Sequence, residues 1–183
     1  MNYFQKKLHE IIRVNHAGEM GAKVIYDGQI AALKIKKDHE TLELVKHMKE
    51  QEDVHFSYFD NEIKKHQVRP TIMQPLWKVG GFALGFVTGL IDKKAAMVCT
   101  TAVEEVIDEH YQEQIKFLDD EVGLDDAKQV YELKQKISQF RDEELEHREI
   151  GYANNAKDLA CFTILSGFIK GATRFAIAVS KRV

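Results

Sequence analysis

Proline is rare in this chain of 183 residues, and its two prolines can interrupt helical structure in only one segment. The two that occur, Pro70 and Pro75, fall in a single short stretch. Because proline removes a backbone hydrogen bond and breaks a helix interior, its absence elsewhere permits long uninterrupted helices. No segment alternates between apolar and polar residues over the length of a strand. We therefore expect an all-α protein without a β-sheet.

Other absences exclude several classes of function. The two cysteines, Cys99 and Cys161, sit in apolar stretches without metal-ligand spacing, so we expect two buried, reduced thiols. The net charge of -3 offers no basic surface to a nucleic acid, and we expect none as a partner. The segment HAGEMG has only two of the glycines of a GxGxxG motif, so no nicotinamide-binding fold is expected. The start, MNYFQKKLHE, has neither the apolar core of a signal peptide nor the Arg- and Ser-rich composition of a transit peptide.

Long helices account for most of the remaining sequence. The pattern predicts a helical hairpin over about 3–66 with its turn near 37–38, and a second hairpin over about 89–155. In the second hairpin Gly123 supplies a break and Asp125 an N-cap. An apolar connection at 67–88 joins the hairpins, and an apolar helix at about 158–180 ends the chain. At this length we expect a single domain over 1–183.

One three-residue spacing occurs twice. Glu52 and His55 form Glu-x-x-His, and Glu144 and His147 repeat it. Residues three apart share a face of a helix, so each pair can offer a carboxylate and an imidazole to the same ion. A lone glutamate precedes each pair in helical sequence. Together they match the ligand set of carboxylate-bridged di-iron and di-manganese four-helix bundles, and they predict a dinuclear site formed by Glu19, Glu52, His55, Glu104, Glu144 and His147.

The second pair has two candidate carboxylates. Glu143 and Glu144 could both reach His147, at spacings of four and three. The residue four before His55 is Gln51, a poor counterpart. Only the three-residue spacing occurs in both halves, which favours Glu144.

Two further choices concern the lone glutamates. Glu104 aligns at helical spacing with apolar residues, and Glu105 aligns with charged and polar ones, so we expect Glu104 to point inward and Glu105 outward. His16 lies three before Glu19, but Thr101 takes the matching place before Glu104. We therefore expect His16 to be a hydrogen-bonded helix histidine rather than a ligand.

The types of ligand atom exclude some metal sites, but they do not identify one reaction. Oxygen and imidazole ligands without thiolates argue against structural zinc and iron–sulfur clusters. Four carboxylates packed together without a cation would repel one another and cost several kcal/mol in desolvation. Iron is the leading ion and manganese the alternative. Hydroxylation, iron oxidation and peroxide reduction all remain open on the ligands alone.

Four segments together resemble one known family. IIRVNHAGEMGA, VRPTIMQPLW, TTAVEEV and FRDEELEHREIG are similar to the demethoxyubiquinone hydroxylases of ubiquinone biosynthesis, and the similarity runs over about 11–179. The resemblance implies a ferritin-like di-iron monooxygenase with two iron ions, ligated by the six residues named above. It would use O2 and two electrons from an external reductant, such as NADH, to hydroxylate the ring of a polyprenyl demethoxyubiquinol, whose product then passes to a methyltransferase.

The resemblance also carries two residues outside the ligand set. Tyr111, seven residues after Glu104 and on the same face, matches a family tyrosine beside the site. His110 matches a neighbouring family histidine, and we expect both near the quinone or the electron path. Asp108 and Glu109 stand where some relatives are expected to have less acidic residues, which leaves the local hydrogen-bond network there unassigned.

Two apolar segments predict contact with a membrane surface. Trp77 precedes the uncharged segment at 79–89, which is too short to span a bilayer. The segment at 159–180 is apolar but carries Lys170 and Arg174, as in an interfacial helix with basic residues at headgroup level. We expect a peripheral protein on the cytoplasmic face of a bacterial membrane, or on the matrix face of the mitochondrial inner membrane in a eukaryote. Covering the bundle core and mediating dimer contacts are the alternatives for both segments.

Two other functions compete with the hydroxylase. A ferritin- or rubrerythrin-like protein that oxidises iron or scavenges peroxide would share the ligands. A storage shell requires a soluble cage, however, which the apolar segments at 71–91 and 158–180 fit poorly. A quinone-binding scaffold with a vestigial site is disfavoured because all six ligands are present. Homo-oligomerisation and a lipid-binding accessory protein of the same pathway are further expected partners.

Overall fold

The computed structural model describes residues 1–120 and 127–182, and all regular structure in these residues is helical. This confirms the all-α prediction. Gly123 and Asp125, expected to break and cap a helix, lie outside the described residues. The elements, in chain order, are α1 (Tyr3–Lys36), α2 (His39–Lys65), α3 (Gln74–Ile91), α4 (Lys93–Asp120), α5 (Ala127–Ala153), the 3-10 turn η1 (Ala156–Asp158) and α6 (Phe162–Ser180).

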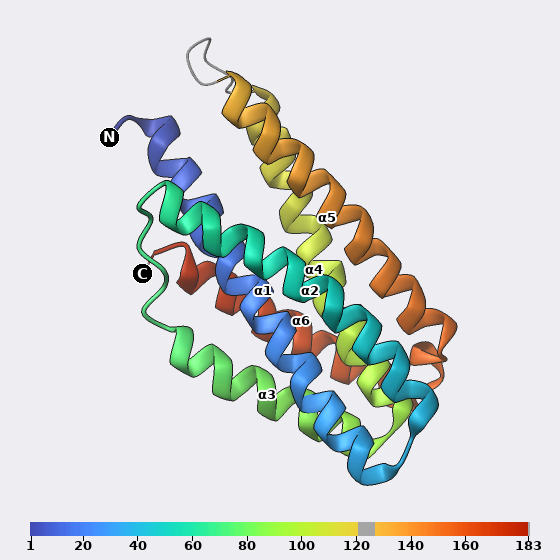
Figure 1. Cartoon of the computed structure of the whole chain (residues 1–183). Coiled ribbons are helices and arrows are strands. Elements are labelled where there is room, and N and C mark those ends of the chain that lie inside the picture. The colour runs from blue at the N-terminus through green and yellow to red at the C-terminus, as the bar shows by residue number, and fades with distance from the viewer. Residues whose placement is uncertain (121–126, 183) are drawn as a thin grey trace.

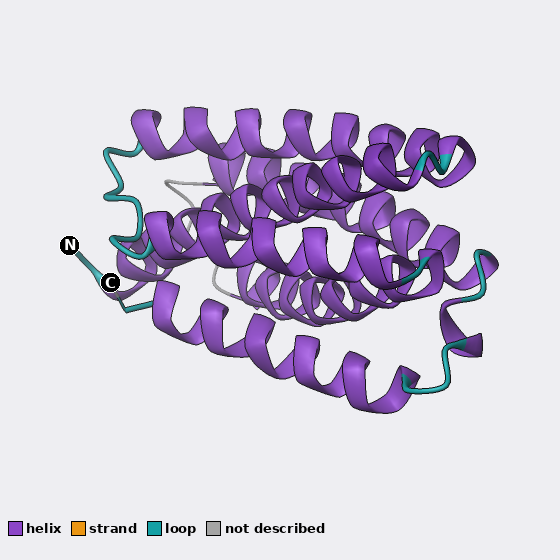
Figure 2. Cartoon of the chain, turned by 90° about the horizontal axis from the view of Figure 1, so that it is seen from below, coloured by secondary structure: helices purple, strands orange, loops and turns teal. Residues whose placement is uncertain are grey.

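The long helices form a bundle of two hairpins. Helices α1 and α2 pack as one pair and α4 and α5 as the other, and α2 also contacts α5 (Figure 1). The shorter helices α3 and α6 flank this bundle: α3 packs mainly on α1, and α6 mainly on α4. Figure 2 shows that the helix axes lie roughly alongside one another, with the loops at the two ends of the bundle. The four long helices can therefore present side chains to one another midway along their length, as in a ferritin-like bundle.

Local signals set the register of the first hairpin. Helix α1 begins with a capping box, in which the Gln5 backbone N–H donates to the Asn2 side chain over 2.8 Å and the Gln5 side chain accepts from the Asn2 backbone over 3.1 Å. The helix ends at Lys37, whose φ of 58° is left-handed. Asp38 then caps α2 by accepting from the Thr41 backbone N–H over 3.1 Å. The short turn makes α1 and α2 antiparallel neighbours.

The apolar connection expected at about 67–88 lies between the two hairpins and is largely helical. Most of that segment is α3, which runs from Gln74 to Ile91, and α4 begins only at Lys93 after an extended residue, Asp92. Pro75 lies in the first turn of α3, where a missing backbone N–H costs nothing. The glycines of α3 lower its helix propensity. They also let its backbone pack closely against α1, and this packing stabilises the helix.

Two apolar clusters stabilise the bundle on either side of its middle. One includes Ile12, Phe59 and Phe140, and the other includes Val45 and Met97. All five side chains are fully or almost fully buried. The segment of the bundle between these clusters is thus shielded from water along the helix axis.

One surface expectation was wrong. Cys161 is exposed, because it lies at the turn that starts α6, whereas Cys99 is buried as expected. Lys170 and Arg174, the basic residues expected at headgroup level, form ion pairs within the chain. Each pairs with an acid of α4: Lys170 with Glu105, and Arg174 with Glu109 over 2.9 Å. Glu105 therefore points away from the bundle centre, as expected, but into a half-buried contact with α6.

We expect Gly85→Ala to destabilise the chain by about 1–3 kcal/mol, the usual range for overpacking. A Cβ at Gly85 would lie 1.9 Å from the Ile25 backbone oxygen, so α3 would have to move away from α1. Gly80 is the matched control on the same helix, since a Cβ there meets nothing within 4 Å. Gly80→Ala should be stabilising by about 0.5–1 kcal/mol through helix propensity. Urea unfolding measures both, and equal effects would contradict the close approach.

Candidate metal centre

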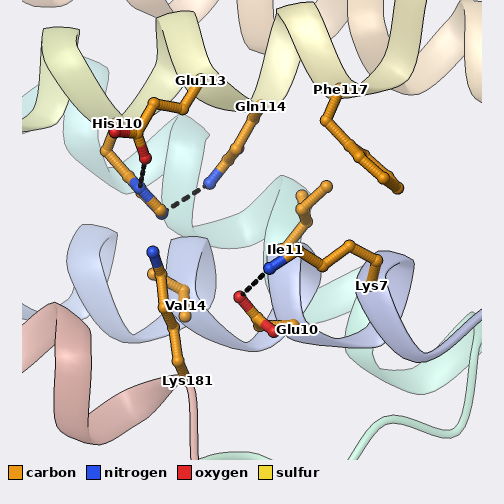
Figure 3. Close-up of a pocket in the computed structure, with 9 residues that line it drawn as sticks. All are labelled: Lys7, Glu10, Ile11, Val14, His110, Glu113, Gln114, Phe117 and Lys181. Atoms are coloured by element: carbon orange, nitrogen blue, oxygen red, sulfur yellow. Dashed lines mark hydrogen bonds and ion pairs between the residues drawn. The ribbon is translucent and has the colours of Figure 1, made fainter. Parts of the chain in front are cut away.

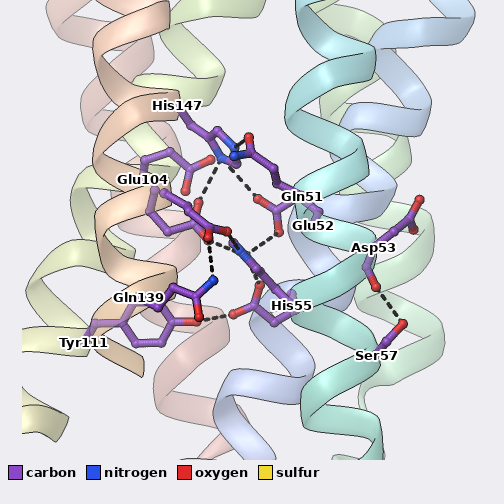
Figure 4. Close-up of polar contacts among 12 residues, drawn as sticks. Gln51, Glu52, Asp53, His55, Ser57, Glu104, Tyr111, Gln139 and His147 are labelled. Atoms are coloured by element: carbon purple, nitrogen blue, oxygen red, sulfur yellow. Dashed lines mark hydrogen bonds and ion pairs between the residues drawn. The ribbon is translucent and has the colours of Figure 1, made fainter. Parts of the chain in front are cut away.

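The six side chains singled out by spacing converge inside the bundle. Glu52, His55, Glu104 and His147 are labelled in Figure 4. Each long helix contributes: α1 and α4 give one carboxylate each, and α2 and α5 each give a carboxylate and an imidazole. Their ligand atoms form two groups of four within 4.8 Å of one another. All are buried. The first group is Glu19, Glu52, His55 and Glu144, and the second is Glu52, Glu104, Glu144 and His147.

Glu52 and Glu144 belong to both groups, and their geometry explains why. The two oxygens of Glu144 lie 3.1 Å from His55 Nδ1 and 3.0 Å from His147 Nδ1. The two oxygens of Glu52 lie 3.4 Å from His147 Nδ1 and 4.0 Å from His55 Nδ1. Each carboxylate thus aims one oxygen toward each imidazole, as a bridge between two ions would. Glu19 belongs to the first group alone, which places it at one end of the centre.

The residues fit a pair of divalent cations. Within residues 1–120 and 127–182, both Glu52 oxygens are buried and accept no hydrogen bond. A buried carboxylate without compensation costs several kcal/mol, which a coordinated cation would offset. Carboxylate oxygen and imidazole nitrogen are donors that suit iron and manganese. The arrangement is therefore able to hold cations that would balance its buried charge.

Without cations, protons must balance the buried charge. Burial and the neighbouring Glu144 carboxylate raise the pKa of Glu52 well above its ordinary value, and burial with the same neighbour does so for Glu104. Burial alone would lower the pKa of His55, but its hydrogen bonds to Glu144 and Glu19 outweigh this and raise it to about 12. The pKa of Glu144 is instead lowered: burial would raise it, but hydrogen bonds from His147 and His55 dominate.

Two tyrosines hold the terminal carboxylates from opposite halves of the chain. Tyr111 of α4 donates to Glu19 of α1, and Tyr26 of α1 donates to Glu104 of α4 over 3.0 Å. Both are fully buried. Sequence reasoning placed Tyr111 beside the site but missed Tyr26. The available signal was its offset, since Tyr26 follows Glu19 by the same seven residues that separate Tyr111 from Glu104.

The outer nitrogen of each imidazole also has a partner that sequence reasoning missed. His55 Nε2 lies 2.6 Å from a carboxylate oxygen of Glu143, and His147 Nε2 lies 2.8 Å from the amide oxygen of Gln51. Glu143 was considered only as a rival ligand to Glu144. It lies behind His55 instead, on the side away from the centre.

Two other histidines lie outside both groups. His110, expected near the quinone or the electron path, faces a cavity of about 80 Å³ between α1, α4 and the end of α6 (Figure 3). Its Nε2 lies 2.7 Å from the Gln114 amide nitrogen. Burial lowers the pKa of His110 to about 4. His16 is a hydrogen-bonded helix histidine as expected, 3.3 Å from the Gln74 amide nitrogen and 3.5 Å from Asp60.

We expect metal loading of this centre to release protons. The pKa of His55, raised to about 12, means that the metal-free cluster holds a proton there near pH 7, and the raised pKa values of Glu52, Glu104 and His147 favour further protons. A cation must displace them, so affinity should rise with pH and more than one proton should leave per chain. A pH indicator in weak buffer during anaerobic Co²⁺ titration measures the release. Binding with no proton release and no dependence on pH would contradict the protonated cluster.

Comparisons with known proteins agree with this architecture. Residues 6–180 match the family model described as ubiquinone biosynthesis protein COQ7. The chain is 47% identical to the 3-demethoxyubiquinol 3-hydroxylase of Rhodospirillum rubrum, over 96% of this chain and 78% of that protein. It is 42% identical to the NADPH-dependent 3-demethoxyubiquinone 3-hydroxylase of Homo sapiens, a mitochondrial protein, over 100% of this chain and 81% of the other. It is 38% identical to the mitochondrial 5-demethoxyubiquinone hydroxylase of Saccharomyces cerevisiae, over 96% and 78%. The chain belongs to the COQ7 family of ubiquinone biosynthesis proteins.

Proposed function

We propose that this chain is a 3-demethoxyubiquinol 3-hydroxylase, an O2-dependent monooxygenase that adds one hydroxyl to the quinol ring in ubiquinone biosynthesis. The observation that carries the proposal is the buried centre of four carboxylates and two imidazoles in a chain whose relatives bear that name. Two iron ions held there would supply O2 binding and the electrons that reduce it. Because the iron-oxidising and peroxide-scavenging alternatives share the ligands, the family membership is what favours the hydroxylase.

The protein groups around the centre hold its geometry and exclude water. The hydroxyl groups of Tyr26 and Tyr111 donate to Glu104 and Glu19, which fixes one oxygen of each terminal carboxylate. The other oxygen of Glu19 faces the imidazole of His55, 3.4 Å from its Nδ1. The apolar clusters on both sides keep bulk water from the centre. A dry, preorganised site directs the reducing electrons to the substrate reaction instead of to water-borne side reactions.

An apolar pocket beside the centre suits the quinol and the first part of its tail. It has a volume of about 210 Å³ and lies between α1, α3, α4 and α6. Gly18 and Ala22 in its wall flank Glu19, and Val103 and Ile107 flank Glu104. The pocket therefore borders the two helices that carry the terminal carboxylates. A ring bound here would lie against the part of the bundle where O2 reacts.

Exposed apolar side chains on α3 and α6 support attachment to a membrane surface. Seven of them are exposed by half or more: Leu76, Val79, Val87, Ile91, Ile164, Phe168 and Phe175. Among the described helices, α6 alone is long and apolar enough to cross a bilayer. Its pairing with Glu105 and Glu109 and its packing on α4 favour a helix that lies along the bundle. We place the protein peripherally on the cytoplasmic face of a bacterial membrane or the matrix face of a mitochondrial inner membrane.

The two electrons must come from outside the chain in this proposal. Several relatives are named NADPH-dependent, whereas the family resemblance led us to expect NADH. We propose a reduced nicotinamide as the source of the electrons, and the activity assay tests NADH and NADPH separately. A second copy of the chain or a lipid-binding accessory protein would have to share the exposed face of α3 and α6 with the membrane.

We expect the iron-loaded chain to add one oxygen atom to the ring of a short-tailed demethoxyquinone. The assay contains Fe²⁺-loaded protein, NADH or NADPH, the quinone and air, and mass spectrometry reads the product. Glu144→Ala should abolish the product, because it removes an oxygen donor shared by both ions. Rapid iron oxidation or peroxide consumption with the quinone unchanged would instead favour the ferritin-like alternative.

The same assay tests the pocket. Gly21 lines it and has nothing within 4 Å of an added Cβ, so Gly21→Leu should fill the space the substrate needs. We expect KM to rise at least tenfold with metal binding unchanged. Gly171→Leu on α6 is the matched control, because Gly171 also has open space but is exposed and outside the pocket lining. Equal kinetics for the two variants would place the substrate elsewhere.

Binding to vesicles should depend on the apolar face of α6. Phe168→Ser with Phe175→Ser removes two large exposed side chains, each worth about 1.5–3 kcal/mol when fully buried. We expect co-sedimentation with vesicles of mixed anionic and neutral lipid to weaken by tenfold or more. Tyr131→Ser, on the exposed side of α5, should leave binding unchanged. An unaltered double variant would rule out this face as the contact.

A further inference from the structure

The two halves of the centre correspond residue by residue except at one place. Glu19 corresponds to Glu104, and the paired tyrosines, glutamates and histidines correspond in the same way, each contacting the opposite half. The position just before the Glu-x-x-His glutamate breaks this repeat. It is Gln51 in the first half and Glu143 in the second.

Both residues at the broken position perform the same structural task. Glu143 of α5 contacts the outer nitrogen of His55 on α2, and Gln51 of α2 contacts the outer nitrogen of His147 on α5. The contacts are reciprocal across the α2–α5 interface and similar in length, at 2.6 and 2.8 Å. What differs is charge, because one imidazole is backed by a carboxylate and the other by a neutral amide.

This difference reaches the centre through the imidazole ring. A carboxylate can only accept, so the Nε2 of His55 carries the hydrogen of this contact, and its Nδ1 faces oxygens of Glu144 and Glu19. A cation in the centre would replace the hydrogen that Nδ1 donates to them. An anionic acceptor draws on the N–H bond more strongly than an amide does and makes the ring a better electron donor. Gln139 donates to the other oxygen of Glu143 over 2.9 Å and holds it in place.

We propose that Glu143 is a positioning residue that makes the ion held by His55 the tighter bound of the two, while Gln51 leaves the ion held by His147 the weaker. The inference rests on the proposed function insofar as it takes the centre to hold two ions. Partners of this kind typically change metal affinity by roughly 10- to 100-fold. The centre would then fill in a fixed order, with the His55 side first.

Anaerobic Co²⁺ titration of the metal-free chain, followed by calorimetry and by absorption, tests the order. Repulsion between the ions makes the second ion bind more weakly than the first even in a symmetric centre. The test is therefore how each substitution changes the affinity of each step, and not the difference between the two steps in the original chain. Glu143→Gln should weaken the first step by roughly 10- to 100-fold and the second by no more than about twofold. Gln51→Glu should strengthen the second step by a similar factor and leave the first nearly unchanged.

The double variant and two controls complete the design. Gln51→Glu with Glu143→Gln should return both steps close to their original values, with the tight site moved to His147. In the original chain His147→Ala should then abolish the weak step, and in the double variant it should abolish the tight one. Glu146→Gln removes the same charge from the exposed side of α5 and should change neither step. Thermal unfolding of each metal-free variant shows that the fold is retained.

The outcomes separate this inference from the proposed function. If Glu143→Gln weakens both steps equally, or neither, Glu143 does not rank the ions and the inference fails. If the original chain binds fewer than two Co²⁺ ions, the dinuclear centre itself fails. Ordered binding of two ions by a chain that leaves demethoxyquinone unmodified would uphold the ranking and overturn only the hydroxylase.

Discussion

The whole structure depends on burying four carboxylates and two imidazoles in one place. Such a cluster requires a scaffold whose own backbone is fully hydrogen-bonded, because further unsatisfied groups at the same depth would be too costly. Long helices meet this condition, and a 28- to 34-residue helix extends about 40–50 Å, well beyond the centre on both sides. The scarcity of proline and the two flanking apolar clusters are consequences of the same requirement.

The approximate twofold repeat extends beyond the ligands. Each half supplies a tyrosine to the terminal glutamate of the other half, and each supplies a partner to the other half's histidine. The hairpins are therefore joined through the centre by polar contacts, in addition to the reciprocal hydrogen bonds between Asn15 of α1 and Gln114 of α4. Loss of one ligand would disturb both halves, because each half contributes groups that contact the ligands of the other.

Sequence reasoning could identify the centre because its spacing is local. Glu-x-x-His is a relation within one helix, and the phase of Glu104 against its apolar neighbours is equally local. The residues that it missed, Tyr26 and Glu143, act across helix interfaces and depend on the register between chain segments far apart. The bounds of α3 could not be read from the sequence for a different reason. Its glycines lower helix propensity, and only the close packing against α1 makes the helix favourable.

The backbone contact between α1 and α3 has a mechanical consequence. At Gly28 and Gly85 the two helices meet without intervening side chains, with room for no additional atom. Side chains between helices act as a compliant layer that can change rotamer under load, and here that layer is missing. Movement of α3 relative to α1, the helix that carries Glu19, would therefore require the two backbones themselves to shift.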